Sequence, residues 1–342
     1  MKDELTGRML AESGGWVRLP SIAPCSDESL DFLDVVARGL RRLAASAGSD
    51  ARRVLAPLAY WMRRASLATV CARAREELLR PCGVVVHIAP GNVEVMFAYS
   101  WAIGVLTGNA NVVRLPSRRT EVSTLILRAI SAALEAPEGR AFEESFAFIS
   151  YDSSLASVTE RLSVMADARV IWGGDQTVTS IRALPAWAGV RDVAFIDKVS
   201  LCLMDSAGVN AMADAELEEL AQRFITDAWT YGQLACSSPR TIVWLGESTR
   251  ARARFWEVLT ESLDEQGSQM GAMNRFVTGV ELAARGVGTP SFSRGVTRVW
   301  VDAFEQGVDG PGEGFFCELQ IDDLGEPLDR LQRRYQTVVH GG

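Results

Sequence analysis

The stretch that decides the fold is residues 83–117, GVVVHIAPGNVEVMFAYSWAIGVLTGNANVVRLPS. It begins with a β-branched apolar run, turns at Pro90, and continues as an apolar segment long enough for a buried helix. A second β-branched run, NVVRL, follows a Gly-Asn turn. A strand, a helix and another strand in this order favour a βαβ unit, in which the two strands lie parallel in one sheet.

The same alternation of strand and helix patterns continues along the chain. Further strands are expected at 145–150, 168–172, 199–205 and 241–246, and further helices at 121–134, 154–165, 176–184, 215–229 and from near Ser248 onward. This rhythm predicts an α/β protein with parallel sheets covered on both faces, as in doubly wound nucleotide-binding domains. Residues 286–314 are glycine-rich and poorly periodic, and we predict no elements there.

The first 80 residues have a different, purely helical pattern. Residues 27–45 carry apolar side chains at helical spacing, and a second helix is expected over 51–79, ending before Pro81. We expect three parts: an N-terminal helical segment 1–80 that packs on the next domain, a nucleotide-binding type domain 81–198, and a second α/β domain 199–342. A chain of 342 residues is long enough for two cores of this size.

Composition excludes several classes of function. The net charge of -8 and the pI near 5.1 argue against a nucleic-acid-binding protein. Six cysteines without a CxxC pair and only two histidines argue against a metal site. The apolar residues 93–107 fall short of the ~20 that a membrane span needs. Scattered cysteines and an N-terminus without an apolar leader predict a cytoplasmic protein.

A second informative segment is YGQLACSSP, residues 231–239. It places Cys236 among small residues, just before Pro239, which ends any helix. Most free cysteines are buried small hydrophobes, so this segment by itself is weak support for a nucleophile. Its weight comes from its occurrence together with residues 83–117.

Both segments resemble the aldehyde dehydrogenase superfamily, and specifically its LuxC-type acyl-CoA reductase branch. Five segments match the superfamily's motifs. They are the strand and loop VVVHIAPGN, the turn and strand through Gly108, Asn109, Pro116 and Ser117, the cysteine loop, VIWGGDQT (170–177) and FIDKVSL (195–201). The resemblance implies an aldehyde dehydrogenase-like fold, with a Rossmann-type cofactor domain over 81–198 and a catalytic cysteine domain over 199–342.

The resemblance also implies two catalytic residues. Cys236 corresponds to the nucleophile that carries the acyl group, and thiolates attack thioesters readily. Asn92 corresponds to the side chain that stabilises the thiohemiacetal oxyanion, together with the backbone N–H of Cys236. For Asn92 the alternative is an ordinary loop residue in a Gly-Asn turn.

The cofactor implied by the resemblance is a nicotinamide dinucleotide, although no GxGxxG fingerprint is present. Trp172, Gly173 and Gly174 correspond to the strand-loop-helix that contacts the cofactor, and an ordinary turn is the alternative. In the VVxKPS-type motif of the superfamily a lysine contacts the adenosine ribose; here the sequence is VVRLPSRR, so Arg114 lies one position out of register with that lysine and Arg118 follows Ser117. Because an arginine fork suits a 2′-phosphate, NADPH is favoured over NADH; a solvated basic helix start is the alternative reading of Arg118 and Arg119.

Two departures from the superfamily pattern bear on function. Alignment on Lys198 puts Ala194 where hydrolytic members carry a water-activating glutamate, which favours transfer to and from thiols over hydrolysis. The chain ends at QTVVHGG, a segment that LuxC-type chains continue well past, so we expect a C-terminally truncated catalytic domain. A short natural form, a trimmed chain and an inactive remnant all remain open.

The sequence thus predicts an NADPH-dependent acyl-CoA reductase. It would reduce an acyl-CoA or acyl-carrier thioester to an aldehyde through S-acyl-Cys236. Expected partners are the thioester itself, an acyl-activating or acyl-transferring protein, and a second copy in a homo-oligomer. The alternatives are a CoA-acylating aldehyde dehydrogenase that works in the oxidative direction and a non-catalytic aldehyde dehydrogenase-like scaffold.

Overall fold

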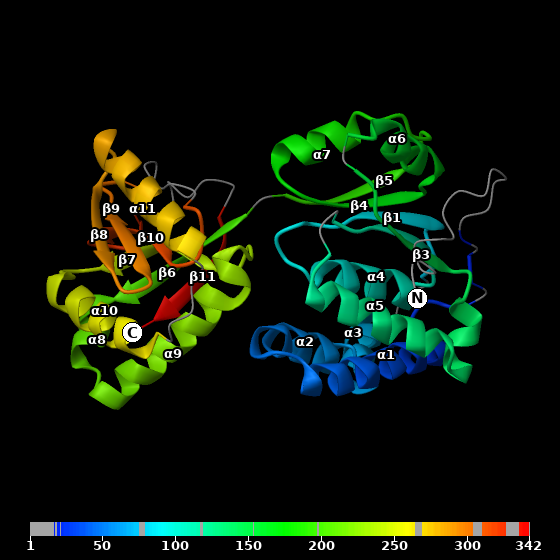
Figure 1. Ribbon diagram of the computed structural model, residues 1–342, viewed down its shortest axis with the longest axis horizontal. Coiled ribbons are helices and arrows are strands. Elements are labelled where there is room, and N and C mark those ends of the chain that lie inside the picture. Colours follow the sequence, from blue (N-terminus) through cyan, green and yellow to red (C-terminus); the bar gives the residue numbers. More distant parts are fainter. Residues whose placement is uncertain are drawn as a thin grey trace. The chain divides into compact units, whose positions relative to one another are not determined.

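The computed structural model describes residues 17, 19–20, 22–74, 79–116, 119–152, 154–196, 198–263, 269–303, 310–325 and 335–341. The chain divides into two compact units, Met1–Ile196 and Asp197–Gly342 (Figure 1). Each unit contains a largely parallel sheet with helices on both faces, so the predicted α/β class is confirmed. The helices expected within residues 1–80 belong to the first unit.

The first unit is built on a five-stranded parallel sheet in the order β3-β2-β1-β4-β5. Its strands are β1 (Val84–Ile88), β2 (Ala110–Arg114), β3 (Phe146–Ile149), β4 (Ala168–Trp172) and β5 (Arg191–Phe195). Apart from His87 and Asn111, β1 and β2 are mostly apolar, and they are largely buried, as expected for a parallel sheet under two helical layers. The strand order reverses direction at β1 and β4, which makes this pair the topological switch point.

Helices cover both faces of this sheet. In Figure 1, α4 (Met96–Leu106) and α5 (Glu121–Leu134) lie on one face and α6 (Ala156–Met165) and α7 (Asp175–Arg182) on the other. A short 3₁₀ turn, η1 (Pro137–Phe142), connects α5 to β3. Helix α5 begins where the sequence predicted, because Thr120 and Ser123 form a reciprocal capping box there.

The N-terminal helices form an additional layer that packs against α5. They are α1 (Asp27–Ser46), α2 (Ser49–Trp61) and α3 (Arg64–Ala74). The expected continuous helix over 51–79 was wrong, because the chain breaks between α2 and α3. The backbone N–H of Arg64 donates to Asp34 Oδ1 on α1 (3.0 Å), and the Arg64 side chain pairs with Asp27. A tertiary cap from α1 therefore fixes the start of α3.

The second unit is built on a six-stranded sheet in the order β11-β6-β7-β10-β9-β8. Its strands are β6 (Val199–Asp205), β7 (Pro239–Leu245), β8 (Thr289–Ser293), β9 (Val296–Trp300), β10 (Phe315–Ile321) and β11 (Tyr335–Gly341). Neighbouring strands are parallel except β8 and β9. This antiparallel hairpin, turning at Gly295 (φ +68°), occupies the region where the sequence allowed no prediction.

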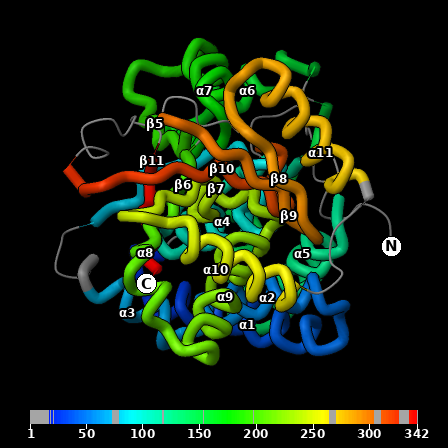
Figure 2. Tube along the Cα trace, turned by 90° about the vertical axis from the view of Figure 1, so that its left-hand side faces the viewer, coloured from blue at the N-terminus to red at the C-terminus, as the bar shows by residue number. Residues whose placement is uncertain are grey.

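Helices cover the second sheet on both faces as well. Figure 2 shows α9 (Asp214–Trp229) and α10 (Thr249–Ser262) below its strands and α11 (Gln269–Ala284) above them. Short helices α8 (Ser206–Ala211) and η2 (Thr230–Gln233) flank α9. Under α9 and α10 an aromatic core encloses the carboxylate of Glu318, which accepts from Trp244 Nε1 (3.0 Å) and Trp256 Nε1 (2.8 Å). Among the described residues, no helix is long and apolar enough to cross a membrane.

Candidate functional site

The predicted cofactor residues that the structure describes gather at one edge of the first sheet. β2 ends at Arg114, β4 ends at Trp172 followed by Gly173 and Gly174, and β1 runs into the loop that carries Asn92. Open α/β sheets bind ligands outside the carboxyl ends of their strands at the switch point, here between β1 and β4. Topology therefore points to the same edge as the motifs. Two further predicted residues, Ser117 and Arg118, lie outside the described residues.

Asn92 lies on the outer side of this edge. Its side chain is exposed, whereas Val93 and Val95 just after it are buried and anchor the loop to the body of the unit. The loop is also tied to the neighbouring strand, because Ala89 N–H donates to the carbonyl of Arg114 (3.2 Å). A fixed loop with an exposed carboxamide can present an N–H donor to a ligand.

Trp172 forms a stacked aromatic pair with Phe195, the last residue of β5. Their ring centroids are 3.9 Å apart and their planes differ by 9°. The two residues are register partners on adjacent strands, and Phe195 remains 44% exposed. We did not predict a role for Phe195. The sequence shows only an aromatic residue next to Ile196 at the end of a strand, and this does not reveal that it stacks on Trp172 of the neighbouring strand.

A buried histidine lies behind this pair. His87 on β1 is 1% exposed, with Nδ1 2.7 Å from Ser100 Oγ on α4 and Nε2 3.0 Å from Asn111 Oδ1 on β2. Burial lowers the pKa of His87 to about 4, so the ring is neutral near pH 7. Ser100 Oγ also accepts from Trp172 Nε1 (3.3 Å).

Gly173 and Gly174 precede α7, and Gly174 occupies its N-cap position without any side-chain cap. A Cβ atom at Gly174 would meet nothing within 4 Å, so there is space beside the start of α7, where the first backbone N–H groups have no partner within the helix. Uncapped N–H groups and the helix dipole suit a phosphate, although Asp175 in the first turn opposes part of that field. These features fit a dinucleotide.

Arg114 provides a positive charge on the same edge. Its guanidinium carbon lies 4.6 Å from the centre of the Tyr151 ring, a cation–π contact that holds the side chain in place. Its Nε is buried and has no hydrogen-bond partner among the described residues. A buried donor without a partner is costly, so an anionic ligand that accepts from it would be favoured.

Cys236 belongs to the second unit, in the turn between η2 and β7 and thus at the amino-terminal edge of that sheet. The turn is strained, since Tyr231 (φ 60°) and Gln233 (φ 62°) adopt left-handed conformations. The thiol side chain is exposed. The carbonyl of Cys236 accepts from Ser200 Oγ on β6 (2.7 Å), which ties the loop to the sheet.

Gln233 holds the cysteine loop from within. It is fully buried, and its amide donates to the carbonyls of Pro239 (3.0 Å) and Phe315 (2.9 Å). Its Oε1 accepts from the backbone N–H groups of Gly314 (2.9 Å) and Phe315 (3.1 Å). Both ends of the side chain are thus bonded to the starts of β7 and β10. Sequence reasoning missed this role, because Phe315 lies far from Gln233 along the chain.

Exposure separates Cys236 and Cys82 from the other four cysteines, which are buried. Burial raises the pKa of Cys202 to about 12, so it has almost no thiolate near pH 7. Cys82 precedes β1 and so lies at the opposite edge of its sheet from Asn92. In the described ranges no group of three or more His, Cys, Asp or Glu is placed to hold a metal ion.

The position aligned with the missing glutamate, Ala194, is partly buried. Ala194 packs against an apolar cluster with Ile171 and Val178 under α7. The residues that follow it, Phe195 and Ile196, are exposed and apolar. Over Ala194–Ile196, therefore, the end of β5 supplies no carboxylate to activate water; Asp197 lies outside the described residues.

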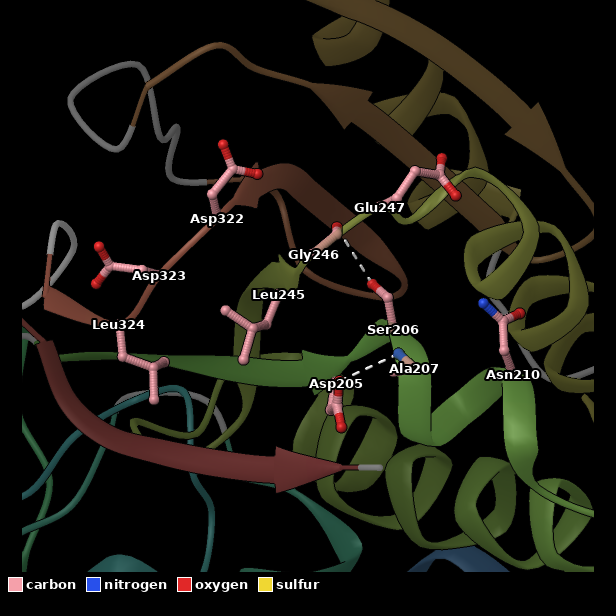
Figure 3. A pocket seen from close by; sticks show the side chains of 10 residues that line it. All are labelled: Asp205, Ser206, Ala207, Asn210, Leu245, Gly246, Glu247, Asp322, Asp323 and Leu324. Atoms are coloured by element: carbon pink, nitrogen blue, oxygen red, sulfur yellow. Dashed lines mark hydrogen bonds between the residues drawn. The ribbon is translucent and has the colours of Figure 1, made fainter.

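A cavity of about 570 Å³ in the second unit lies elsewhere. Figure 3 shows carboxylates of Asp205, Glu247, Asp322 and Asp323 around it. It opens at the carboxyl ends of β6, β7 and β10, whereas Cys236 precedes β7 at the opposite edge. Its negative charge also disfavours a phosphate-bearing ligand. We therefore do not assign it to the cysteine site.

The architecture is that of the aldehyde dehydrogenases. Aldehyde dehydrogenase 21 from Physcomitrella patens, in complex with the reaction product succinate, superposes with a TM-score of 0.63 at 16% identity, covering 89% of this chain and 70% of that one. Proline utilization A from Bradyrhizobium japonicum gives 0.66 at 15% identity (91% and 35% covered). An oxidoreductase from Marinobacter aquaeolei gives 0.62 at 14% identity (92% and 72%). At these identities the likeness establishes the fold.

The family follows from the sequence match. The family model described as acyl-CoA reductase (LuxC) matches residues 65–274, more than half of the chain, so the protein belongs to the LuxC acyl-CoA reductase family. The resemblance seen in the motifs is thereby confirmed, and the protein is an enzyme, an aldehyde-related oxidoreductase. No curated protein matches the chain.

Proposed function

We propose that this enzyme reduces an acyl thioester, carried on CoA or on an acyl-carrier protein, to an aldehyde with NADPH, through an acyl group bound to Cys236. The observation that carries the proposal is the exposed thiol of Cys236 in a loop fixed by Gln233 and Ser200, inside the region that matches the family. Six scattered cysteines without a CxxC pair fit the reducing cytoplasm as its location.

In the proposed reaction the Cys236 thiolate attacks the thioester carbonyl carbon. The carbon–sulfur bond to the carrier breaks, and the carrier leaves as a thiol after taking up a proton. During attack the negative charge on the carbonyl oxygen is stabilised by the side-chain N–H of Asn92 and the backbone N–H of Cys236. After reduction, collapse of the thiohemiacetal releases the aldehyde and returns the Cys236 thiolate.

A bound nicotinamide cofactor supplies the hydride for the reduction. The residues proposed to hold it are Trp172 and Gly173–Gly174 at the switch point, and Arg114, Ser117 and Arg118 beside the 2′-phosphate. The uncapped N–H groups at the start of α7 and the unpartnered Arg114 Nε support this assignment. NADPH is preferred over NADH because a guanidinium can bind the additional phosphate with two hydrogen bonds.

The preference for NADPH gives a testable prediction. Arg114→Ala should weaken NADPH binding by about 10-fold or more and NADH binding much less, because a charge-assisted hydrogen bond is worth roughly 1.5–3 kcal/mol. Titration of both cofactors against both proteins measures the difference. Arg128→Ala, an exposed arginine on α5, is the matched control. Equal losses for the two cofactors would remove Arg114 from the 2′-phosphate site.

The decisive experiment follows the fate of the acyl-enzyme when NADPH is withheld. The acyl group should persist on Cys236 in buffer and be transferred rapidly to added CoA thiol. Hydrolysis should be slow because residues 194–196 carry no carboxylate that could activate water. General-base activation typically contributes ~10²–10⁴-fold, so its lack leaves hydrolysis slow. Intact-mass spectra over minutes, with and without CoA, measure both rates. Rapid release of free acid without thiol would falsify the thioester-reductase proposal.

A further inference from the structure

A continuous chain of hydrogen bonds runs from the interior of the first unit to the aromatic pair at the switch point. It links Asn111 on β2 to His87 on β1, His87 to Ser100 on α4, and Ser100 to Trp172 at the end of β4. His87, Ser100 and Asn111 are all buried. The chain thus joins three strands and one helix around the proposed cofactor site.

Which atom donates in each hydrogen bond follows from the residues at the two ends of the chain, Asn111 and Trp172. Asn111 Nδ2 donates to the carbonyl of Asn109 (2.8 Å), so its Oδ1 faces His87 as an acceptor. His87 therefore carries its proton on Nε2, and Nδ1 accepts from the hydroxyl of Ser100. Ser100 Oγ in turn accepts from Trp172 Nε1. The Nε2–H of His87, the hydroxyl of Ser100 and the Nε1–H of Trp172 each have an acceptor in this arrangement, which favours it.

The local sequence is adapted to this network. A Cβ atom at Gly104 on α4 would lie 1.9 Å from Asn111 Oδ1, so only glycine lets α4 approach β2 this closely. The burial that depresses the pKa of His87 also keeps its ring neutral, as the direction of the bonds requires. On the other side, Trp172 stacks on Phe195, so one edge and one face of the indole are both held.

We infer that His87 and Ser100 are positioning residues for the cofactor, and that they act by fixing the plane of the Trp172–Phe195 pair, against which a flat heteroaromatic ring of the dinucleotide packs. Phe195 is 44% exposed at the carboxyl end of its strand, where such a ring can reach the pair. Stacking on an aromatic face depends on the tilt of that face. The inference rests on the proposed function, because it takes the dinucleotide as the ligand.

The test is a titration of the enzyme with NADPH, with tryptophan excited and the emission of the bound cofactor recorded. Ser100→Ala should raise the Kd for NADPH about five- to tenfold, the effect of one lost neutral hydrogen bond, and should reduce energy transfer to the cofactor. Trp172→Phe should remove most of that transfer. Ser145→Ala is the matched control: Ser145 is an equally buried serine, bonded to the carbonyl of Phe142 at the opposite edge of the sheet.

His87 is tested by a pair of variants. His87→Leu should behave like Ser100→Ala, whereas His87→Gln should recover most of the affinity, because a carboxamide can accept from Ser100 and donate to Asn111. A role confined to folding would lower the unfolding midpoints of Ser100→Ala and Ser145→Ala alike and leave NADPH binding unchanged. That result would overturn the inference. If the wild-type enzyme binds neither NADPH nor NADH, the cofactor assignment of the proposed function fails, and this inference fails with it.

Discussion

Cys236→Ala is expected to abolish acyl-enzyme formation and to lower aldehyde production by roughly 10⁴–10⁶-fold, the range found when a covalent nucleophile is removed. The reason is that the reaction requires a thiol that can displace the carrier and then hold the acyl group. Cys202, the nearest alternative along the chain, is buried with a pKa raised to about 12. Intact-mass spectrometry after incubation with acyl-CoA, without cofactor, measures the adduct directly.

The matched control for this prediction is Cys82→Ala. Cys82 is the other exposed cysteine, but it lies before β1, away from the strand ends that carry Asn92 and Trp172. Removing it should leave one acyl adduct per chain and an unchanged rate. An adduct that survives in Cys236→Ala and disappears in Cys82→Ala would identify Cys82, in the first unit, as the nucleophile. That result would overturn the proposed mechanism. A wild-type chain that never acylates would favour the non-catalytic scaffold.

Asn92→Ala is expected to slow turnover by about 10²–10³-fold, which corresponds to ~2.7–4 kcal/mol of transition-state stabilisation from one oxyanion donor. Binding of NADPH should change little, because the substitution removes a donor to the reacting oxygen and no group proposed to contact the cofactor. Single-turnover rates of acylation and reduction, together with the Kd for NADPH, separate these effects.

Asn274→Ala provides the control for loss of an exposed asparagine, since Asn274 lies on α11. Asn92→Asp tests the chemistry further. A carboxylate at this position cannot donate and repels the developing oxyanion, so its rate should be no higher than that of the alanine variant. Near-normal turnover in Asn92→Ala would make Asn92 an ordinary turn residue and would remove it from the mechanism.

Much of the architecture could be predicted because local sequence and tertiary structure agree. The β-branched run that became β1 and the capping box that begins α5 each act within a few residues, so their effect can be read without knowledge of the fold. The motifs around Asn92 and Cys236 were sufficient to indicate the family. Their catalytic roles remain predictions.

Other features were missed because the residues responsible lie far apart in the chain. The break between α2 and α3 depends on Asp34 of α1, which caps Arg64. The hairpin of β8 and β9 gains its stability from pairing with β10 rather than from a strong pattern of its own. In both places a long-range contact overrides what local propensity suggests.

The sequence by itself determined the class of fold, the family and the two segments that carry Asn92 and Cys236, because apolar periodicity and contiguous motifs are local properties. Only the tertiary structure decided how those segments are held. Gln233 fixes the cysteine loop through backbone groups of Pro239 and Phe315, and Ser100 reaches Trp172 across the first unit. A buried polar side chain needs hydrogen-bond partners, and those partners can lie far away along the chain. Spacing in the sequence therefore does not show which residues will pair.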